Sequence, residues 1–424
     1  MSETIEATFR IVTPMFLGGA DQGISDGIRP PSVKGALRCW WRALNWGRFR
    51  TEAGADDASA LTKMHAEEAR LFGLAADEVG TGGQGCFLLK VHHDNLGTTA
   101  KNSIHFGFKP TRLINRNGRN EIDRNHLAGA RYLGYGLMVP FTSKDQDTGV
   151  TKYAGQLMRE CLNENKEFTL KLIFRNIVEP SINDALIAWG LLGSLGSRAR
   201  HGMGSIALTS LRQDKVERWT VPVSESDYDA RVEEYINNRI RISTTLPPFS
   251  AFWQSARIDR LISTTDCYSV LDDFGKALMM YRSWGSSALG NLLPGGASEK
   301  RFKDDHDWFK NPGWQIYNPN FHPKRAVFGM PHNYHKGHHH VTPASHNRRS
   351  SPLLFHAHPI GDKFVGVSIY LPSLFLPDGE MIKANGIDVP ATIDWSVITD
   401  FIDGKVGNPP SAIDRFPGKK TILP

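Results

Sequence analysis

The chain has 424 residues, of which 40% are hydrophobic and 22% are charged. This length and composition are typical of a globular protein with two domains, and they exclude a disordered or fibrous chain. With 50 Lys and Arg residues against 44 Asp and Glu residues, the net charge of +6 permits a polyanionic partner without requiring one.

The sequence also argues against a membrane protein, a secreted protein and a zinc-thiolate protein. It contains no run of about 18 apolar residues, so no membrane span is predicted, and the alternating N-terminal residues do not resemble a signal peptide. The four cysteines are scattered and form no Cys-x-x-Cys pair, which argues against a disulfide framework and a thiolate zinc site. We expect a cytoplasmic protein without metal, cofactor or membrane partner. The cysteines are Cys39, Cys86, Cys161 and Cys267.

Patterns of apolar residues divide the first half of the chain into six elements. The first strand alternates strictly from Ile5 to Ile11, and a helix follows Ser32, a good N-cap residue. A second helix is predicted after Ser181. The apolar residues of the first helix recur at helical spacing and are Val33, Ala36, Leu37, Trp40 and Leu44. The predicted strands cover residues 5–11, 85–93, 168–174 and 205–211.

In chain order these elements give the pattern β-α-β-β-α-β. This is the split arrangement of ferredoxin-like and RRM-like domains. We therefore place an N-terminal domain at residues 1–212. About 75 residues separate its second and third strands, too many for a structureless loop, so we predict an insertion at about residues 93–167.

The second half of the chain predicts a less complete copy of the same plan. A polar, charged linker at residues 213–248 precedes it. The C-terminal domain, residues 249–424, should contain a strand, a helix, two strands and a helix, with only Thr421–Pro424 left for a fourth strand. The fold class is therefore α+β, with tandem ferredoxin-like domains. The predicted elements lie near residues 249–258, 266–284, 352–356, 364–371 and 393–402.

A glycine- and arginine-rich loop, LGSRARHGMGSI at residues 195–206, follows the second predicted helix. Gly202, Gly204 and Ala207 fit the G-x-G-x-x-A pattern of dinucleotide sites, but that motif leaves a strand and opens a helix. Here a helix precedes the loop and a strand follows it, so we exclude a nucleotide cofactor.

The same loop has the composition of a phosphate contact. Its glycines, Gly196, Gly202 and Gly204, let another backbone approach closely, and free loop amides can cradle a phosphate. Arg198 and Arg200 can donate charge-assisted hydrogen bonds to phosphate oxygens. A tight helix-to-strand turn with two solvated arginines explains the pattern equally well.

Basic residues also gather on three other segments. Lys34, Arg38 and Arg42 form one stripe along the first helix beside Trp41, although such a stripe is usually a solvated helix flank. Together the basic segments favour an extended polyanionic partner such as a nucleic acid. If Trp41 or Phe108 were exposed, its ring could stack on the bases of such a partner. The remaining basic residues are Arg348 and Arg349 in the second half, and Lys109, Arg112, Arg116, Arg119, Arg124 and Arg131 in the insertion.

Several segments together resemble a known family. FRIVTPMFLGGADQ (residues 9–22), IRPPSVKGALRCWWRAL (28–44), EARLFG (68–73), the glycine-rich loop and RRSSPLLF (348–355) resemble the RAMP superfamily of CRISPR proteins. Within it, the resemblance is to the first subunit of the type III-B, or Cmr, effector complex, and it is most specific over residues 9–44. Loops of this family often follow G-x-G-x5-G-x-G, whereas Ser194 replaces the first glycine here.

The resemblance implies tandem ferredoxin-like folds and a non-catalytic RNA-binding subunit. Its partners would be the 3′ part of a guide RNA, a target RNA and the other subunits of the complex. By position, the RNA contacts would be Lys34, Arg38, Trp41, Arg42, Arg198, Arg200, His201, Arg348 and Arg349.

Two other functions stay open. Some RAMP proteins are metal-independent ribonucleases that use a histidine, and His201 stands in the basic loop, although a histidine among arginines is more often a phosphate contact. A pure assembly subunit would use its arginines to bind acidic protein neighbours. Residues 332–346 and Asp304–Asp307 are rich in possible metal ligands without zinc-type spacing, so we expect a mobile histidine-rich loop and no metal.

Overall fold

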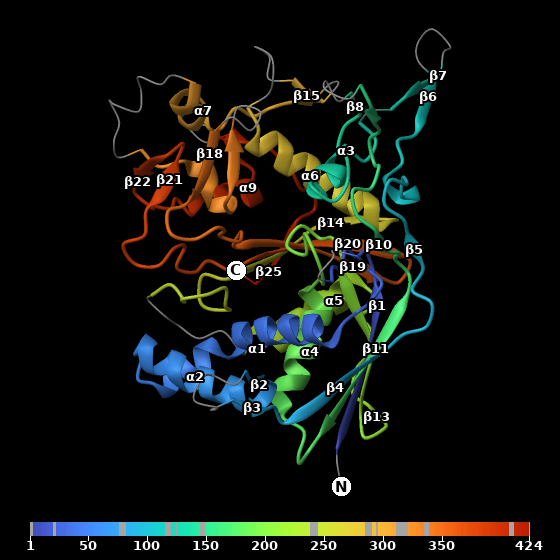
Figure 1. Cartoon of the computed structure of the whole chain (residues 1–424), viewed down its shortest axis with the longest axis vertical. Coiled ribbons are helices and arrows are strands. Elements are labelled where there is room, and N and C mark those ends of the chain that lie inside the picture. Colours follow the sequence, from blue (N-terminus) through green and yellow to red (C-terminus); the bar gives the residue numbers. More distant parts are fainter. Residues whose placement is uncertain are drawn as a thin grey trace.

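The computed structural model of the chain consists of two α/β units (Figure 1). Elements of the first half of the chain, blue to green, lie in the lower part of the view, and those of the second half, yellow to red, lie in the upper part. The insertion, in teal, lies beside the second unit. The structure describes residues 3–19, 23–75, 82–114, 120–123, 125–144, 149–237, 245–284, 291–293, 296–310, 321–334, 339–406 and 411–423.

A five-stranded antiparallel sheet with the order β13-β12-β1-β11-β4 forms the frame of the first unit. Its central strand β1 alternates between buried and half-buried residues, which confirms the predicted first strand. The other three predicted strands of this half are also present. The strands are β1 (Thr4–Ile11), β4 (Phe87–His92), β11 (Glu167–Phe174), β12 (Ile206–Gln213) and β13 (Val216–Glu217).

Two of the helices in this unit begin at proline. Helix α1 has its N-cap at Arg29 and α4 has its N-cap at Glu179, and neither residue makes a side-chain capping bond. Proline suits the first helical position, where the amide hydrogen has no partner, so the predicted caps at Ser32 and Ser181 are wrong. Helix α2 has no counterpart among the predicted elements. The helices are α1 (Pro30–Glu52), α2 (Asp57–Phe72), α4 (Pro180–Leu192) and α5 (Glu225–Ile236).

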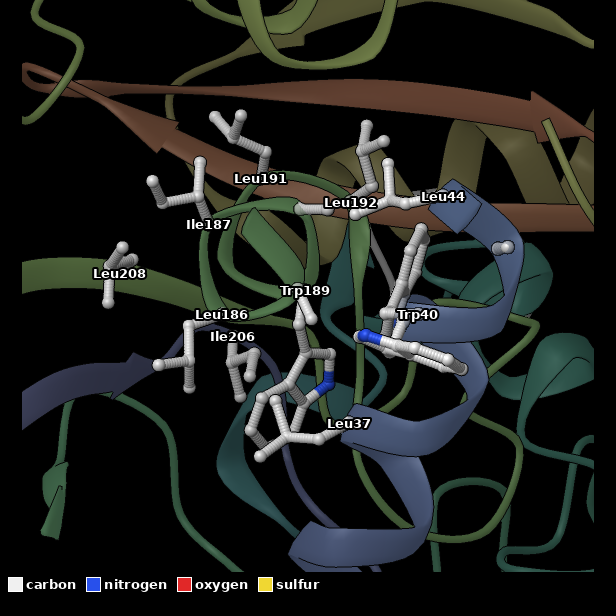
Figure 2. Packing of buried hydrophobic residues seen from close by; sticks show 14 of the residues in the cluster. Leu37, Trp40, Leu44, Leu186, Ile187, Trp189, Leu191, Leu192, Ile206 and Leu208 are labelled. Atoms are coloured by element: carbon white, nitrogen blue, oxygen red, sulfur yellow. The ribbon is translucent and has the colours of Figure 1, made fainter. Parts of the chain in front are cut away.

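Aromatic side chains fill the space between the first sheet and its helices. Figure 2 shows Trp189 of α4 beside Leu37 and Trp40 of α1. The ring centroid of Phe9 on β1 lies 5.0 Å from that of Trp189 and 5.5 Å from that of Phe168. Burial of these apolar side chains holds α1 and α4 together on the sheet.

The second unit repeats the strand order of the first. Its antiparallel sheet has the order β19-β20-β14-β25, so the second, third, first and fourth strands lie side by side, as β4-β11-β1-β12 do in the first unit. The C-terminal residues form β25 and complete the copy that the sequence patterns leave unfinished. The elements are β14 (Arg257–Thr264), α6 (Cys267–Arg282), β19 (Leu353–Ile360), β20 (Lys363–Tyr370), α9 (Ser396–Asp403) and β25 (Lys420–Leu423).

The strand predicted near residues 249–258 is wrong, since β14 begins only at Arg257. The apolar residues of this segment pack into the first unit instead. The amide of Phe252 donates a hydrogen bond to the carbonyl oxygen of Ala43 (2.9 Å), and its ring centroid lies 6.3 Å from that of Trp40. The apolar pattern therefore belongs to a linker that crosses between the two units.

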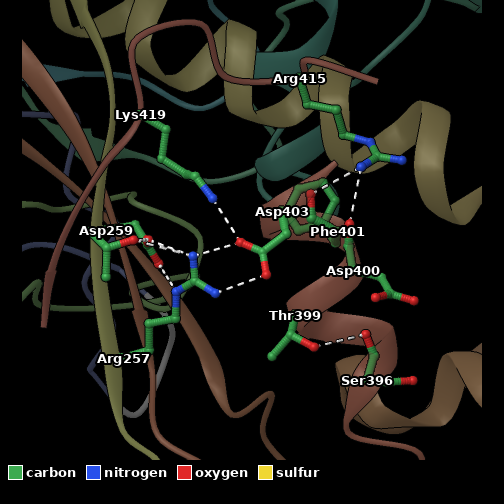
Figure 3. A network of polar contacts seen from close by, with 10 residues as sticks. Arg257, Asp259, Ser396, Thr399, Asp400, Phe401, Asp403, Arg415 and Lys419 are labelled. Carbon is green, nitrogen blue, oxygen red and sulfur yellow. Dashed lines mark hydrogen bonds and ion pairs between the residues drawn. The ribbon is translucent and has the colours of Figure 1, made fainter. Parts of the chain in front are cut away.

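An ion-pair network fastens the C-terminal segment to the second sheet (Figure 3). Asp403, at the end of α9, accepts hydrogen bonds from Arg257 of β14 (2.7 Å) and Lys419 (2.7 Å), and Arg257 also bonds Asp259 (2.8 Å). Burial raises the pKa of Asp403, but the bonds from Arg257 and Lys419 outweigh it and lower the pKa to about 2. The carboxylate is therefore charged at neutral pH and ties α9 to β14.

Shorter elements surround the two sheets. The described part of the histidine-rich segment belongs to a small sheet with the order β17-β18-β21-β22, so the predicted mobile loop is wrong there. No helix among the described residues is long and apolar enough to span a bilayer. The shorter elements are β2 (Gly73–Leu74), β3 (Gly83–Gln84), β5 (Thr98–Thr99), η1 (Phe106–Phe108), β6 (Arg112–Ile114), β7 (Asn120–Ile122), α3 (Ala128–Leu133), β8 (Ser143–Lys144), β9 (Thr151–Lys152), β10 (Cys161–Leu162), β15 (Asn291–Leu293), β16 (Gly296–Ala297), α7 (Lys303–Lys310), η3 (Lys324–Phe328), β17 (His332–Tyr334), β18 (His339–Pro343), β21 (Ile382–Ala384), β22 (Ile387–Val389), β23 (Lys405–Val406) and β24 (Ser411–Ala412).

The insertion packs against the second unit through a close contact between two helices. Helix α3 of the insertion lies on α6 where Gly129 meets Gly275, and a Cβ atom on either glycine would collide with main-chain atoms of the other helix. Asp272 of α6 accepts hydrogen bonds from the amides of Gly129 (2.7 Å) and Ala130 (3.3 Å). The insertion therefore connects the first unit to the second.

We predict that Gly129→Ala destabilises the protein by about 1–3 kcal/mol, because the new methyl group overpacks the contact between α3 and α6. The matched control is Gly35→Ala on α1, where a Cβ atom would meet nothing within 4 Å. Alanine at that position should raise the stability slightly, since it favours a helix. Thermal unfolding measures both effects. A melting temperature of Gly129→Ala equal to that of the wild type would contradict the predicted loss of stability.

Candidate nucleic-acid interface

The glycine-rich loop connects α4 to β12 and lies at the junction of the two units. The amide of Phe355 on β19 donates a hydrogen bond to the carbonyl oxygen of Arg200 (2.9 Å). The amide of Ala357 on the same strand donates to Oγ of Ser205 (3.2 Å). The loop of the first unit is therefore bonded to the edge strand of the second sheet.

The protein's own packing requires the three glycines of the loop. All have positive φ angles, +100° at Gly196, +80° at Gly202 and +66° at Gly204. A Cβ atom at Gly196 would lie 2.6 Å from the carbonyl oxygen of Phe16, and one at Gly202 would lie 2.9 Å from the ring of Phe355. The close backbone approach that the sequence predicts thus takes place within the protein.

Several loop amides are bonded within the protein and do not form a phosphate cradle. The amides of Ser197, His201 and Gly204 donate to carbonyl oxygens of Phe16 (2.8 Å), Arg198 (2.8 Å) and Pro14 (2.9 Å), respectively. Any phosphate contact of this loop therefore falls mainly to its side chains.

The two arginines of the loop differ in exposure. Arg198 is exposed, and its Nε donates a hydrogen bond to the carbonyl oxygen of Tyr135 in the insertion (2.9 Å). Arg200 is half-buried, and its Nη1 donates to the carbonyl oxygen of Ser351 (2.6 Å). A guanidinium group has five N–H donors, so these contacts leave donors for a ligand on both side chains.

Three arginines of the second half lie beside this loop. Burial and the charge of Arg200 lower the pKa of Arg349 to about 10, and the exposed Arg348 precedes it. Arg282, in the last turn of α6, donates to Nδ1 of His332 (3.1 Å). The sequence analysis missed Arg282, because nothing in the pattern of α6 indicates what its last turn faces.

Five arginines from both halves thus form one cluster, the junction arginines, namely Arg198, Arg200, Arg282, Arg348 and Arg349. Desolvation, followed by the charges of Arg282 and Arg348, lowers the pKa of Arg198. Within the described residues, no carboxylate forms an ion pair with any member of the cluster. The positive charge at the junction is therefore uncompensated, as a site for a polyanion requires.

His201 lies among the junction arginines and is uncharged at neutral pH. Its Nδ1 donates a hydrogen bond to the carbonyl oxygen of Leu133 (3.2 Å). Burial, followed by the charges of Arg198 and Arg282, lowers the pKa of His201 to about 3. The imidazole can form a hydrogen bond to a ligand, but it adds no positive charge to the cluster.

The surface beside the loop is hollowed. A cavity of about 270 Å³ lies between α1, the loop and β19. Cys39 and Trp40 of α1, Gly196 and Arg200 of the loop, and Leu354 of β19 are among the residues that line it. Arg200 thus places a positive charge in the wall of a mainly apolar hollow.

The family of the first unit follows from its sequence. Residues 8–207 match the model of the RAMP superfamily. This segment belongs to the RAMP superfamily. The match ends in the second residue of β12, so the RAMP segment contains α1, β11, α4 and the whole glycine-rich loop.

Several solved structures of low sequence identity also match the chain. The apo form of Cmr1 from Pyrococcus furiosus has 18% identity and a TM-score of 0.48, covering 99% of this chain and 98% of that chain. A chain of the type III-B Cmr-beta complex bound to cognate target RNA has 12% identity and a TM-score of 0.47, covering 95% and 98%. A chain of a type IV-B CRISPR complex has 16% identity and a TM-score of 0.28, covering 53% and 96%. No curated protein matches the sequence.

The basic stripe of α1 in the RAMP segment has its own acidic partner. Arg38 and Arg42 both bond the carboxylate of Glu68 on α2, Arg42 at 2.8 Å, and Glu68 is only 3% exposed. Nζ of Lys34 donates to the carbonyl oxygen of Phe72 (2.9 Å). The stripe therefore attaches α2 to α1, and we leave it out of the candidate interface.

The two aromatic residues considered for base stacking are buried. Trp41 is 0% exposed, and its Nε1 donates a hydrogen bond to Oγ of Ser181 (3.0 Å). Phe108 is also 0% exposed. The prediction that either ring stacks on RNA is therefore wrong, because both rings are enclosed by the protein core.

The basic residues of the insertion have mixed roles. Arg131 is buried and donates to the carbonyl oxygens of Pro140 (2.9 Å) and His126 (2.7 Å), so its role is structural. Lys109 is exposed. The side chain of Arg112 and the residues Arg116, Arg119 and Arg124 lie outside the described residues.

The acidic segment Asp304–Asp307 lies on α7 and serves the fold. Asp305 is buried and accepts hydrogen bonds from the amide of Lys324 (3.0 Å) and the hydroxyl of Tyr334 (2.8 Å). In the part of the chain that the structure describes, no group of three or more His, Cys, Asp or Glu residues is arranged to hold a metal ion.

We predict that Glu68→Gln lowers the stability by about 1–3 kcal/mol, because it leaves two partly buried arginines without their carboxylate. The matched control is Glu67→Gln, whose carboxylate bonds the exposed Arg70 on the same helix (2.7 Å). That change should cost less than about 1 kcal/mol. Thermal unfolding compares the variants, and equal melting temperatures would show that Glu68 has no special role in attaching α2.

Proposed function

We propose that this protein is a non-catalytic RNA-binding subunit of a type III-B CRISPR effector complex, acting in the cytoplasm. It holds the backbone of the 3′ part of the guide RNA, of the target RNA, or of both, and assembles with the other subunits. The RAMP match over residues 8–207, the motif resemblance of residues 9–44 and 348–355, and the junction arginines support this proposal. We interpret the two units as tandem ferredoxin-like folds, which their common strand order supports.

The uncompensated charge of the junction arginines carries the proposal. Guanidinium groups bind phosphate oxygens through paired, charge-assisted hydrogen bonds. Arg198 and Arg348 are exposed, and they come from different halves of the chain. Phosphate contacts position a nucleic acid without reading its sequence, so base pairing between guide and target would supply the specificity.

We propose no catalytic step at this site. A ribonuclease would use His201 as a general acid or base, which works best when its pKa is near the operating pH. The pKa of His201 is about 3, and its Nδ1 is bonded to the carbonyl oxygen of Leu133. These properties favour a hydrogen-bonding role for His201 beside the phosphate contacts.

We predict that Arg198→Ala combined with Arg348→Ala weakens the binding of single-stranded RNA and reduces its salt dependence. Each lost phosphate contact should lower the slope of log affinity against log salt by about 0.7, so the loss of two contacts lowers it by about 1.4. Fluorescence anisotropy of labelled RNA at a series of salt concentrations measures the affinity and the slope together.

The matched control for this variant combines Arg48→Ala with Arg212→Ala. Both arginines are exposed but pair with carboxylates, those of Glu52 and Glu217. The control should bind RNA like the wild type. If the junction variant binds RNA like the wild type but fails to assemble with the other subunits, the junction arginines serve assembly and do not hold RNA.

We also predict that RNA incubated with the purified protein stays intact, both for the wild type and for His201→Gln. Glutamine keeps a hydrogen-bonding side chain at this position but cannot act as an acid or base catalyst at neutral pH. Denaturing gels of end-labelled RNA test this. Site-specific cleavage by the wild type that disappears in His201→Gln would overturn the non-catalytic function.

A further inference from the structure

Tyr135 of the insertion lies next to the junction arginines with its side chain in solvent. It is 58% exposed, and its carbonyl oxygen accepts the hydrogen bond from Nε of Arg198 (2.9 Å). Neither the pattern of the insertion nor the family motifs single it out. An exposed aromatic ring beside guanidinium groups is typical of surfaces that bind unpaired nucleotides.

Contacts with the insertion fix Arg198 in an unfavourable backbone conformation. Its φ angle is +60°, a value that residues other than glycine adopt at a cost and often at functional sites. Arg159 of the insertion donates to Oγ of Ser197 (3.0 Å) and to the carbonyl oxygen of Leu17 (3.0 Å). The bond to Tyr135 and the bonds from Arg159 thus hold this part of the loop against the insertion.

The charges around Arg198 are positive. After desolvation, the charges of Arg282 and Arg348 lower the pKa of Arg198, whereas the hydroxyl groups of Tyr132 and Tyr135 raise it. Two further guanidinium groups and the Tyr135 hydroxyl are therefore close enough to influence the charge of Arg198. The combination of a flat apolar ring and clustered cations matches the two halves of a nucleotide, its base and its phosphate.

We propose that Tyr135 and Arg198 bind one nucleotide of single-stranded RNA, with the base stacked on the Tyr135 ring and a neighbouring phosphate on the Arg198 guanidinium. This inference rests on the proposed RNA-binding function and adds a base contact supplied by the insertion. Stacking tolerates any base, because every base has a π face. The contact therefore favours unpaired RNA over duplex RNA without selecting a sequence.

Four proteins test this inference: the wild type, Tyr135→Ala, Tyr135→Phe and Tyr153→Ala. Tyr153 is a matched control, since it lies in the same insertion and is 55% exposed. We expect Tyr135→Ala to weaken binding of a single-stranded RNA by about 5- to 150-fold, while Tyr135→Phe and Tyr153→Ala bind like the wild type. Because the main-chain oxygen of Tyr135 bonds Arg198, alanine keeps that contact.

A second ligand separates base stacking from phosphate binding. Inorganic polyphosphate has no bases, so its affinity should be the same for Tyr135→Ala and the wild type. RNA affinity for Tyr135→Ala equal to that for Tyr153→Ala, or equal losses for RNA and polyphosphate, would overturn the base contact. In either case, weaker RNA binding by the variant that combines Arg198→Ala with Arg348→Ala would still support the proposed RNA-binding function. Failure of the wild type to bind RNA would overturn both.

Discussion

Hydrogen bonds from β19 to the glycine-rich loop join the two units at the point where the proposed RNA-binding surface forms. The loop must lie against both Phe16 and Phe355, and this requirement explains its glycines at Gly196 and Gly202. The contact between the loop and β19 also brings the loop arginines beside Arg348 and Arg349, which precede β19, and Arg282, in the last turn of α6. A site assembled in this way needs both halves of the chain, because each half contributes only some of its residues.

Charge compensation decides which basic residues remain for a ligand. Arg38 and Arg42 lie on a helix that resembles a phosphate-binding surface in sequence, but both guanidinium groups are paired with the nearly buried carboxylate of Glu68. Arg198 and Arg348 have no such carboxylate within the described residues. Residues of one chemical type thus divide into a structural set and an interface set, and only the three-dimensional arrangement distinguishes the two.

Sequence patterns predict β1 and β11 well because each of these strands is fully buried on one face only, which produces their alternation. Sequence patterns mislead where the contacts of a residue lie far away in the sequence. Phe252 suggested a strand but packs against α1, and proline rather than serine begins α1 and α4. The family motifs led to Arg348 and to the loop. Arg282 and Tyr135 reach the interface only through tertiary contacts, so no local pattern could indicate them.

The insertion contacts both partners of the junction, α6 through Gly129 and the loop through Arg159. Much of the orientational freedom between the units is therefore lost during folding, before any ligand arrives. A ligand that binds a surface already assembled does not have to order it, so less of its interaction free energy is spent on conformational entropy. The insertion between β4 and β11 thus preorganises the proposed binding surface.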